Sequence, residues 1–128
     1  MGLFQGLLGN ASQADIDAFN REWGGLIGTE ENVVAVFKLD GGWVVFTDKR
    51  FIYIQNIILK RATAVNVDSI PYHQIVHFSV KSAGIMDLNS ELFVSTCDPY
   101  KYYSITSDKN VNVYEIQAIL ADAISKFK

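Results

Sequence analysis

The chain of 128 residues has a single cysteine, two prolines and no cluster of basic residues. Because Cys97 stands alone, an intramolecular disulfide is excluded, as is usual for proteins of a reducing compartment. The formal net charge is −3, and Lys and Arg are scattered along the chain. Nucleic acid and anionic lipid surfaces both favour a basic protein face. We therefore expect neither nucleic acid nor a membrane among the partners.

Long apolar runs are absent as well. No stretch reaches the roughly 18 consecutive apolar residues that a membrane-spanning helix needs. The segment "MGLFQGLLGNAS" at 1–12 has no Lys or Arg ahead of a short, glycine-interrupted apolar stretch, unlike a secretory signal. Gly6 occupies the position at which N-myristoylation requires Ser or Thr. The sequence thus predicts a cytoplasmic protein.

What the chain does contain is apolar and aromatic side chains arranged in two different periods. Hydrophobic residues make up 49% of the chain, and the eight Phe, six Tyr and two Trp favour strands over helices. The length is that of one globular domain, so we predict a single domain over residues 1–128.

Residues 1–28 follow a helical period and predict an N-terminal helical extension. Ser12 is a suitable N-cap for a helix that Gly24-Gly25 should end. The apolar stripe of that helix comprises Ile16, Phe19 and Trp23. An earlier stripe, weakened by glycines and in need of a surface to lie on, comprises Leu3, Phe4, Leu7 and Leu8.

Between residues 33 and 106, seven short segments rich in β-branched and aromatic residues predict seven strands. They read "VVAVFKL", "WVVFT", "RFIYIQN", "TAVNVDSIPY", "IVHFSVKS", "ELFVSTC" and "KYYSIT", with turn residues between them. The charged stretch 47–50, "TDKR", is interpreted as the bend between two buried strands, with Asp48-Lys49 turning the chain. We do not interpret it as a catalytic or phosphate-binding loop.

Two features of these strands bear on their surroundings. Alternation in "IVHFSVKS" predicts that Val76, Phe78 and Val80 share one face, with the intervening residues on the other. The runs "WVVF" and "FIYI" are apolar on both faces, whereas a small barrel buries only one. The second face therefore needs a cover, which either the N-terminal segments or a neighbouring subunit would supply.

Residues 111–127 return to a helical period. Asn112 and Glu115 have the spacing of a capping box, although Asp108 or Asn110 could serve instead. The stripe that would face the core comprises Val113, Ile116, Leu120, Ala123, Ile124 and Phe127. Seven antiparallel strands closed by one C-terminal amphipathic helix is a mainly β plan, α+β by content.

Five stretches give the whole chain a family resemblance: "MGLFQGLLGNAS", "FTDKRFIYI", "IPYHQIVHFSV", "DLNSEL" and "NVYEIQAIL". In this order they are similar to the bacterial pleckstrin-homology family, formerly catalogued as a domain of unknown function. The resemblance implies a seven-stranded antiparallel pleckstrin-homology-like barrel capped by its C-terminal helix. It also implies a tendency to form ring-like oligomers, and it implies no established activity.

The residues that could carry chemistry do not converge on a site. Inositol-phosphate binding needs several cations on the first hairpin, which offers only Lys38 beside Asp40. His73 and His77 lack a convincing third metal ligand, and Asp98 beside Cys97 discourages a thiolate. No nucleophile is matched to a base. We predict no enzyme activity, no catalytic residue, no cofactor and no metal, and we do not expect a phosphoinositide ligand.

Surplus apolar surface is the remaining signal. The candidate interface residues are Leu3, Phe4, Leu7, Leu8, Ile57, Ile58 and Leu59. We predict a non-enzymatic binding or scaffold module that self-associates through such surface as a cyclic homo-oligomer. Two alternatives stay open: a monomeric module that binds a peptide or small ligand at a barrel edge, and peripheral membrane association through the N-terminal stripe. A different protein as partner is also left open.

Overall fold

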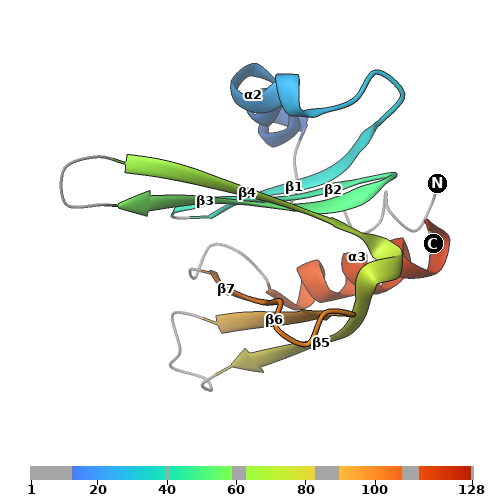
Figure 1. The fold of residues 1–128 in the computed structure, drawn as a ribbon. Helices are drawn as coiled ribbons and strands as arrows, with labels where there is room; N and C mark the ends of the chain where they lie inside the picture. Colours follow the sequence, from blue (N-terminus) through green and yellow to red (C-terminus); the bar gives the residue numbers. More distant parts are fainter. Residues whose placement is uncertain (1–12, 40, 59–62, 83–89, 108–112, 128) are drawn as a thin grey trace. The chain divides into compact units, whose positions relative to one another are not determined.

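The computed structural model describes residues 13–39, 41–58, 63–82, 90–107 and 113–127 (Figure 1). The strands are β1 Val33–Leu39, β2 Gly42–Thr47, β3 Arg50–Ile58, β4 Thr63–Pro71, β5 Ile75–Ser82, β6 Ser90–Thr96 and β7 Tyr102–Ser107. The helices are α2 Gln13–Trp23, the short 3-10 turns η1 Gly24–Leu26 and η2 Tyr72–Gln74, and α3 Val113–Lys126. The seven predicted strands and both flanking helices are thereby confirmed. In the described part of the chain, no helix has the length and apolarity needed to cross a membrane.

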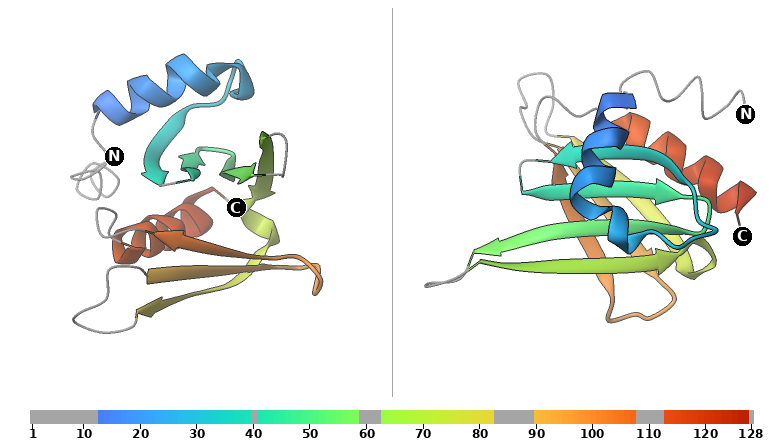
Figure 2. Two further views of the ribbon diagram at one scale, coloured as in Figure 1. Left: turned by 90° about the vertical axis from the view of Figure 1, so that its left-hand side faces the viewer. Right: turned by 90° about the horizontal axis from the view of Figure 1, so that it is seen from above.

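The chain divides after Ile70 into two compact units, each with its own sheet. The first contains a sheet of order β1-β2-β3-β4, and α2 lies over one face of it (Figure 2). On that face Phe19 of α2 packs with Val36, Trp43, Val45, Ile52 and Ile54, and its ring meets Trp43 edge-on with centroids 5.7 Å apart. Partly buried side chains from α2, η1 and the neighbouring strands complete this cluster: Ile16, Ala18, Trp23, Leu26, Ile27, Val33 and Val67.

Both faces of the central strands are buried. Every residue of β2 is buried, and so are Phe51, Ile52, Tyr53 and Ile54 of β3. The N-terminal elements α2 and η1 therefore supply the cover that one face of this sheet needed. The alternative cover, a neighbouring subunit, is not required for that face.

Gly42 allows β2 to approach β3 closely at the end of β2 that follows the β1-β2 turn. A Cβ atom on Gly42 would overlap the backbone carbonyl of Ile54 on the adjacent strand, whereas one on Gly41 would meet nothing within 4 Å. Gly42 pairs with Gln55, and the backbone N–H of Asn56 donates to the carbonyl of Gly41 at 2.8 Å. The close approach of β2 to β3 at this end thus depends on the missing side chain.

The second unit contains a sheet of order β5-β6-β7, with α3 packed on β5, β6 and η2 (Figure 1). Its core is built from alternate strand positions and from the helix stripe: Leu92, Val94, Ile105, Val113, Ile116, Ile119, Leu120 and Ala123. Tyr72 stacks on Phe127 at 5.9 Å between ring centroids. The predicted C-terminal stripe is thus the core face of α3.

The predicted alternation in β5 is wrong at its first residues. The register of β5 against β6 shifts between Ile75 and His77, which is a β-bulge that leaves Val76 as an extra residue. As a result Ile75 is buried and Val76 is exposed, so Val76 does not share the face of Phe78 and Val80 that strict alternation predicted. A one-residue insertion exchanges the faces of the residues on either side of it.

Candidate functional site

The turn between β2 and β3 is organised by a buried hydroxyl. Thr47 is the one buried polar residue of the described core, with no exposed surface. Its Oγ1 accepts the backbone N–H groups of Lys49 and Arg50, each at 3.0 Å. The same hydroxyl donates to Oε2 of Glu31 at 2.6 Å. Thr47 thus fixes the turn and joins it to the segment that precedes β1.

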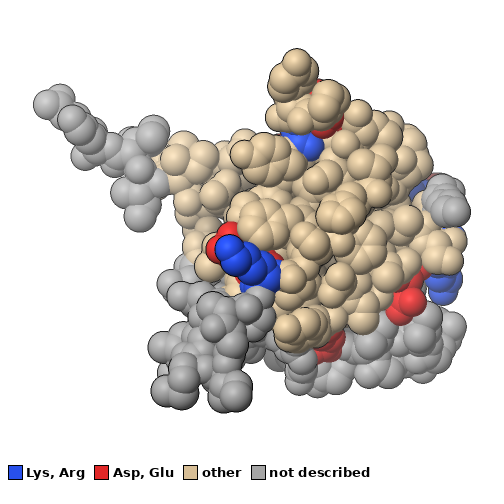
Figure 3. Space-filling view, turned by 90° about the horizontal axis from the view of Figure 1, so that it is seen from below, with Lys and Arg blue, Asp and Glu red and all other residues tan. Residues whose placement is uncertain are grey.

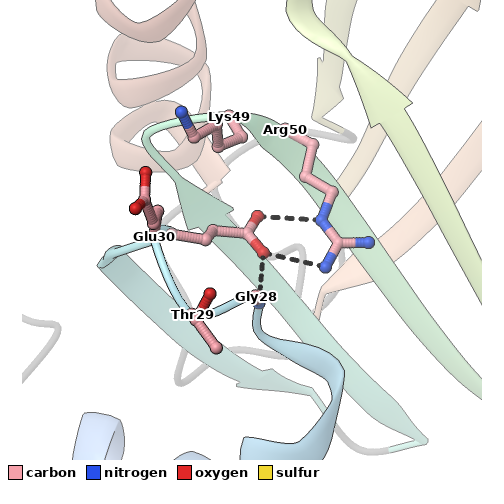
Figure 4. Close-up of a pocket in the computed structure, with 6 residues that line it drawn as sticks. Gly28, Thr29, Glu30, Lys49 and Arg50 are labelled. Atoms are coloured by element: carbon pink, nitrogen blue, oxygen red, sulfur yellow. Dashed lines mark hydrogen bonds and ion pairs between the residues drawn. The ribbon is translucent and has the colours of Figure 1, made fainter.

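Glu31 and Arg50 form a two-pronged ion pair beside this hydroxyl (Figure 4). Nε of Arg50 donates to Oε2 of Glu31 at 2.8 Å, and Nη2 donates to Oε1 at 2.9 Å. Oε1 also accepts the backbone N–H of Gly28 at 3.0 Å. The Glu31 side chain is only 7% exposed, so the pair is largely withdrawn from solvent on the carboxylate side. Bidentate geometry of this kind makes the strongest arginine–carboxylate contacts.

The remaining contacts of Arg50 reach two further elements. Nη1 donates to Oγ of Ser69 on β4 at 2.7 Å, and Nη2 also donates to the carbonyl of Leu26 in η1 at 2.7 Å. A second set of hydrogen bonds joins Asn32 to Asp48, the residues adjacent in sequence to Glu31 and Thr47. The backbone N–H and the amide of Asn32 both donate to the carboxylate of Asp48 at 3.0 Å, and the N–H of Asp48 donates back to the Asn32 carbonyl at 3.0 Å.

These contacts set the protonation of the pair. The guanidinium of Arg50, with help from Thr47 and Gly28, lowers the pKa of Glu31 to about 2 against the opposing effect of burial. In return, the hydrogen bonds to Glu31 raise the pKa of Arg50. The carboxylate is therefore ionised throughout the physiological range and is committed to holding the turn. It is poorly suited to accept a proton in a reaction at neutral pH.

A pocket of about 450 Å³ opens beside this pair, lined by Gly28, Thr29, Glu30, Glu31, Lys49 and Arg50 (Figure 4). Its walls carry two acids and two bases, and one acid and one base already neutralise each other. Lys49 is exposed, and Figure 4 shows its side chain directed away from the ion pair. One further cation facing one further anion does not favour a polyphosphate headgroup.

The other predicted site residues are dispersed. Lys38 lies over the buried ring of Trp43, with its ammonium 5.2 Å from the ring centroid. His73 lies in η2 and His77 in β5, so the two do not share a strand. Cys97 is exposed beyond the end of β6. Among the described residues no group of three or more His, Cys, Asp or Glu is placed to hold a metal ion.

Of the interface candidates, Ile57 is exposed to 37% on β3. Ile58 closes β3, but its side chain lies outside the described residues. The other candidates lie outside the described residues altogether: Leu3, Phe4, Leu7, Leu8 and Leu59. Their assignment to an interface stays a prediction.

Sequence reasoning missed two features. Glu31, the partner of Arg50, is 19 residues away along the chain, and nothing local marks it as a partner. It also missed exposed apolar side chains on the strands and in the turn of β6-β7: Val65, Val76, Tyr100 and Tyr102. The Asp98-Pro99 turn signal places Tyr100 at a hairpin tip, so exposure of that residue was accessible to sequence reasoning.

Seven antiparallel strands in two sheets and a C-terminal helix have the plan of a pleckstrin-homology-like fold. Two solved structures share it: a pleckstrin homology domain from Shewanella amazonensis and a DUF1696 family protein with such a domain from Shewanella loihica. The first has a TM-score of 0.76 at 30% identity over 94% of this chain and 96% of its own. The second has a TM-score of 0.65 at 28% identity over 87% and 91%.

The family follows from the sequence match. Residues 2–124 match the family described as the bacterial PH domain, and the chain belongs to that family. The chain is also similar to the uncharacterized protein YjqA of Bacillus subtilis, with 40% identity over 125 residues, which is 94% of this chain and 97% of that protein. The resemblance inferred from the motifs is therefore confirmed.

Proposed function

We propose that this bacterial pleckstrin-homology domain is a non-enzymatic binding module that associates with further copies of itself into a closed ring. One observation supports this most directly. Strands β3 and β4 continue beyond the rest of their sheet and expose apolar side chains there. Ile57 is 37% exposed and Val65 is 48% exposed, and apolar surface of this kind favours a protein partner.

The edge position of β4 adds a second reason. In the order β1-β2-β3-β4, strand β4 has a hydrogen-bonded neighbour on one side only. Over its nine residues it carries one charged side chain, Asp68, and no Lys or Arg. Charged residues, and lysine above all, are a common protection of exposed edges. A long edge with so little charge is suited to contact with another chain.

The polar cluster argues for a binding role over a catalytic one. The groups that could have acted chemically, Glu31, Thr47 and Arg50, are bonded to one another and to the backbone. Their geometry fixes a turn and leaves no nucleophile–base pair within the cluster.

Light scattering or native mass spectrometry at micromolar concentration tests the proposal. We expect a mass several times the single-chain value of 14.3 kDa. The variant Ile57→Asp should lower that mass, because a carboxylate at the interface would lose its hydration. A single species of 14.3 kDa at all concentrations up to about 1 mM would refute self-association and favour a monomeric ligand-binding module.

A further inference from the structure

We propose that the ring forms by contact between two different surfaces: the projecting end of the β3-β4 hairpin on one copy and the outer face of the β5-β6-β7 sheet on the next. This inference rests on the proposed self-association and specifies its interface. The first surface, here called the hairpin extension, comprises the described residues 56–58 and 63–66. The second, here called the tyrosine face, comprises Val76, His77, Ser95, Tyr100 and Tyr102.

The hairpin extension lacks cover from its own sheet. Pairing of β2 with β3 ends at Gly42 with Gln55, so residues 56–58 run past the last residue of β2. Figure 2 shows the paired ends of β3 and β4 projecting beyond the neighbouring strands. Ile57 lies on the same face of β3 as Phe51 and Tyr53. Val65 lies on the same face of β4 as Val67, which packs on the α2 side. Each face of the extension therefore presents one exposed aliphatic side chain.

The tyrosine face is assembled by the register of the second sheet. His77 pairs with Ser95, and Ser95 pairs with Tyr102, so these three lie in one row across the strands. The bulge adds Val76 next to this row, 62% exposed. Tyr102 is 68% exposed, and Tyr100, in the adjacent turn, is 90% exposed. This row lies on the face opposite to the buried Leu92, Val94 and Ile105.

The described residues of both surfaces are uncharged, whereas Lys60 and Arg61, which the sequence places between the two strands of the hairpin extension, lie outside the described residues. The described residues of the hairpin extension include no Asp, Glu, Lys or Arg, and the tyrosine face has none among its five residues. Figure 3 views the sheet from the side turned away from α3 and shows few charged residues among the other residues there. At the far end of the strands Lys81 of β5 lies opposite Glu91 of β6 in the register of the sheet. The turn that contains Tyr100 has one acidic residue, Asp98, and one basic residue, Lys101.

Charge indicates a second copy as the occupant. Each chain carries a formal charge of −3, which favours the approach of a second copy to Lys60 and Arg61, the two cations that the sequence places between the strands of the hairpin extension. Nucleic acid or anionic lipid would require a basic surface, and the tyrosine face has no Lys or Arg among its five residues. Exposed tyrosine rings are frequent in protein interfaces, where their flat faces accept aliphatic side chains.

The two surfaces differ, so the contact is heterologous. Every copy would offer its hairpin extension to one neighbour and its tyrosine face to another, and such head-to-tail contacts close into a ring. Neither surface has to be self-complementary. This arrangement can be tested by mixing two variants that are each defective in one surface.

Three variants serve the test. The hairpin variant carries Ile57→Lys and Val65→Lys, the face variant carries Tyr102→Lys, and the control carries Tyr114→Lys. Tyr114 is a tyrosine of similar exposure, 59%, on α3 and outside both surfaces. If Tyr102→Lys fails to fold by circular dichroism, Tyr100→Lys replaces it in the exposed turn.

We expect the control to keep the wild-type mass. The hairpin and face variants alone should each be monomeric, with the dissociation constant raised at least about tenfold, as loss of a contact worth 1.4 kcal/mol would give. Their equimolar mixture should form a one-to-one dimer, because the intact face of one variant receives the intact hairpin of the other. A dimer in the mixture is the specific signature of a heterologous contact.

Failure of this inference differs from failure of self-association. If the wild-type chain assembles but both variants keep its mass, or if the mixture stays monomeric, the assignment of surfaces is wrong and self-association stands. If the wild-type chain is itself monomeric, self-association fails, and this inference fails with it.

Discussion

The β2-β3 turn and the hairpin extension lie at opposite ends of β3 and differ in how their side chains are satisfied. The turn contains three charged residues, yet Asp48 and Arg50 are bonded within the chain. The extension contains no charged residue among those described, yet its aliphatic side chains are exposed. Charge at the turn therefore serves the fold, and the surface available to a partner is the apolar one. Changes at the turn should alter stability, whereas changes in the extension should alter assembly.

The largest effect is expected where the extension meets the first hairpin. Gly42→Ala places a methyl group against the carbonyl of Ile54 and should destabilise the fold by more than about 3 kcal/mol, because strands rather than a flexible side chain must move. Gly41→Ala is the matched control, since a Cβ there meets nothing within 4 Å. Urea denaturation measures both. Equal stability of the two variants would contradict the close approach.

At the turn, Arg50→Met should destabilise the fold by about 3 kcal/mol, because Glu31 would stay buried without its cation. Lys49→Met, one residue away and exposed, should change stability by less than about 0.5 kcal/mol. Thermal and urea unfolding of the pair give the comparison. A cost for Lys49→Met that matched that of Arg50→Met would show that general charge matters and the ion pair does not.

Acid should weaken the turn selectively. The pKa of Glu31 is about 2 when folded and near 4.5 when unfolded, so between these values the unfolded chain binds more protons and stability rises with pH. The contribution is complete above about pH 5 and should fall by about 2 kcal/mol between pH 5 and pH 3. Urea denaturation across this range measures it. Glu31→Gln should remove that part of the slope, and an unchanged slope would contradict the assignment.

The smallest effect on stability is expected in the extension. Ile57→Lys should change the free energy of unfolding of the single chain by less than about 0.5 kcal/mol, because the side chain is already 37% exposed. The measurement is made at a protein concentration low enough to exclude association. A loss above about 2 kcal/mol would mean that Ile57 is a core residue of its own unit, and the contrast between turn and extension would then disappear.

Much of the fold was predictable because it depends on local period. The seven strands, α2 and α3 follow from alternation, turn residues and helical stripes, which are properties of neighbouring residues. The bulge at Val76 was not predictable, because one extra residue leaves the β-branched pattern of the strand intact while it reverses which side chains face the core. The pattern predicted that Val76 shares a face with Phe78 and Val80, and the register shift at the bulge separates Val76 from them.

The candidate site was less predictable because it depends on distant pairs. The stretch 47–50 was correctly interpreted as a bend, but the role of Thr47 within it required Glu31, which comes from another segment. Exposure of Ile57 likewise depends on where β2 ends relative to β3, which the sequence of β3 alone does not encode. Composition could suggest surplus apolar surface, and only the sheet geometry shows which residues form it.

The contacts of Arg50 also have a consequence for the order of folding events. Its hydrogen bonds join residues 19 and 24 positions apart along the chain, so they require η1, β3 and β4 to be in place before they can form. Interactions that are made after the rate-limiting barrier change the unfolding rate and leave the refolding rate nearly unchanged. We predict that the Arg50 contacts form after this barrier, so that loss of Arg50 shortens the lifetime of the native chain while refolding proceeds at its usual rate.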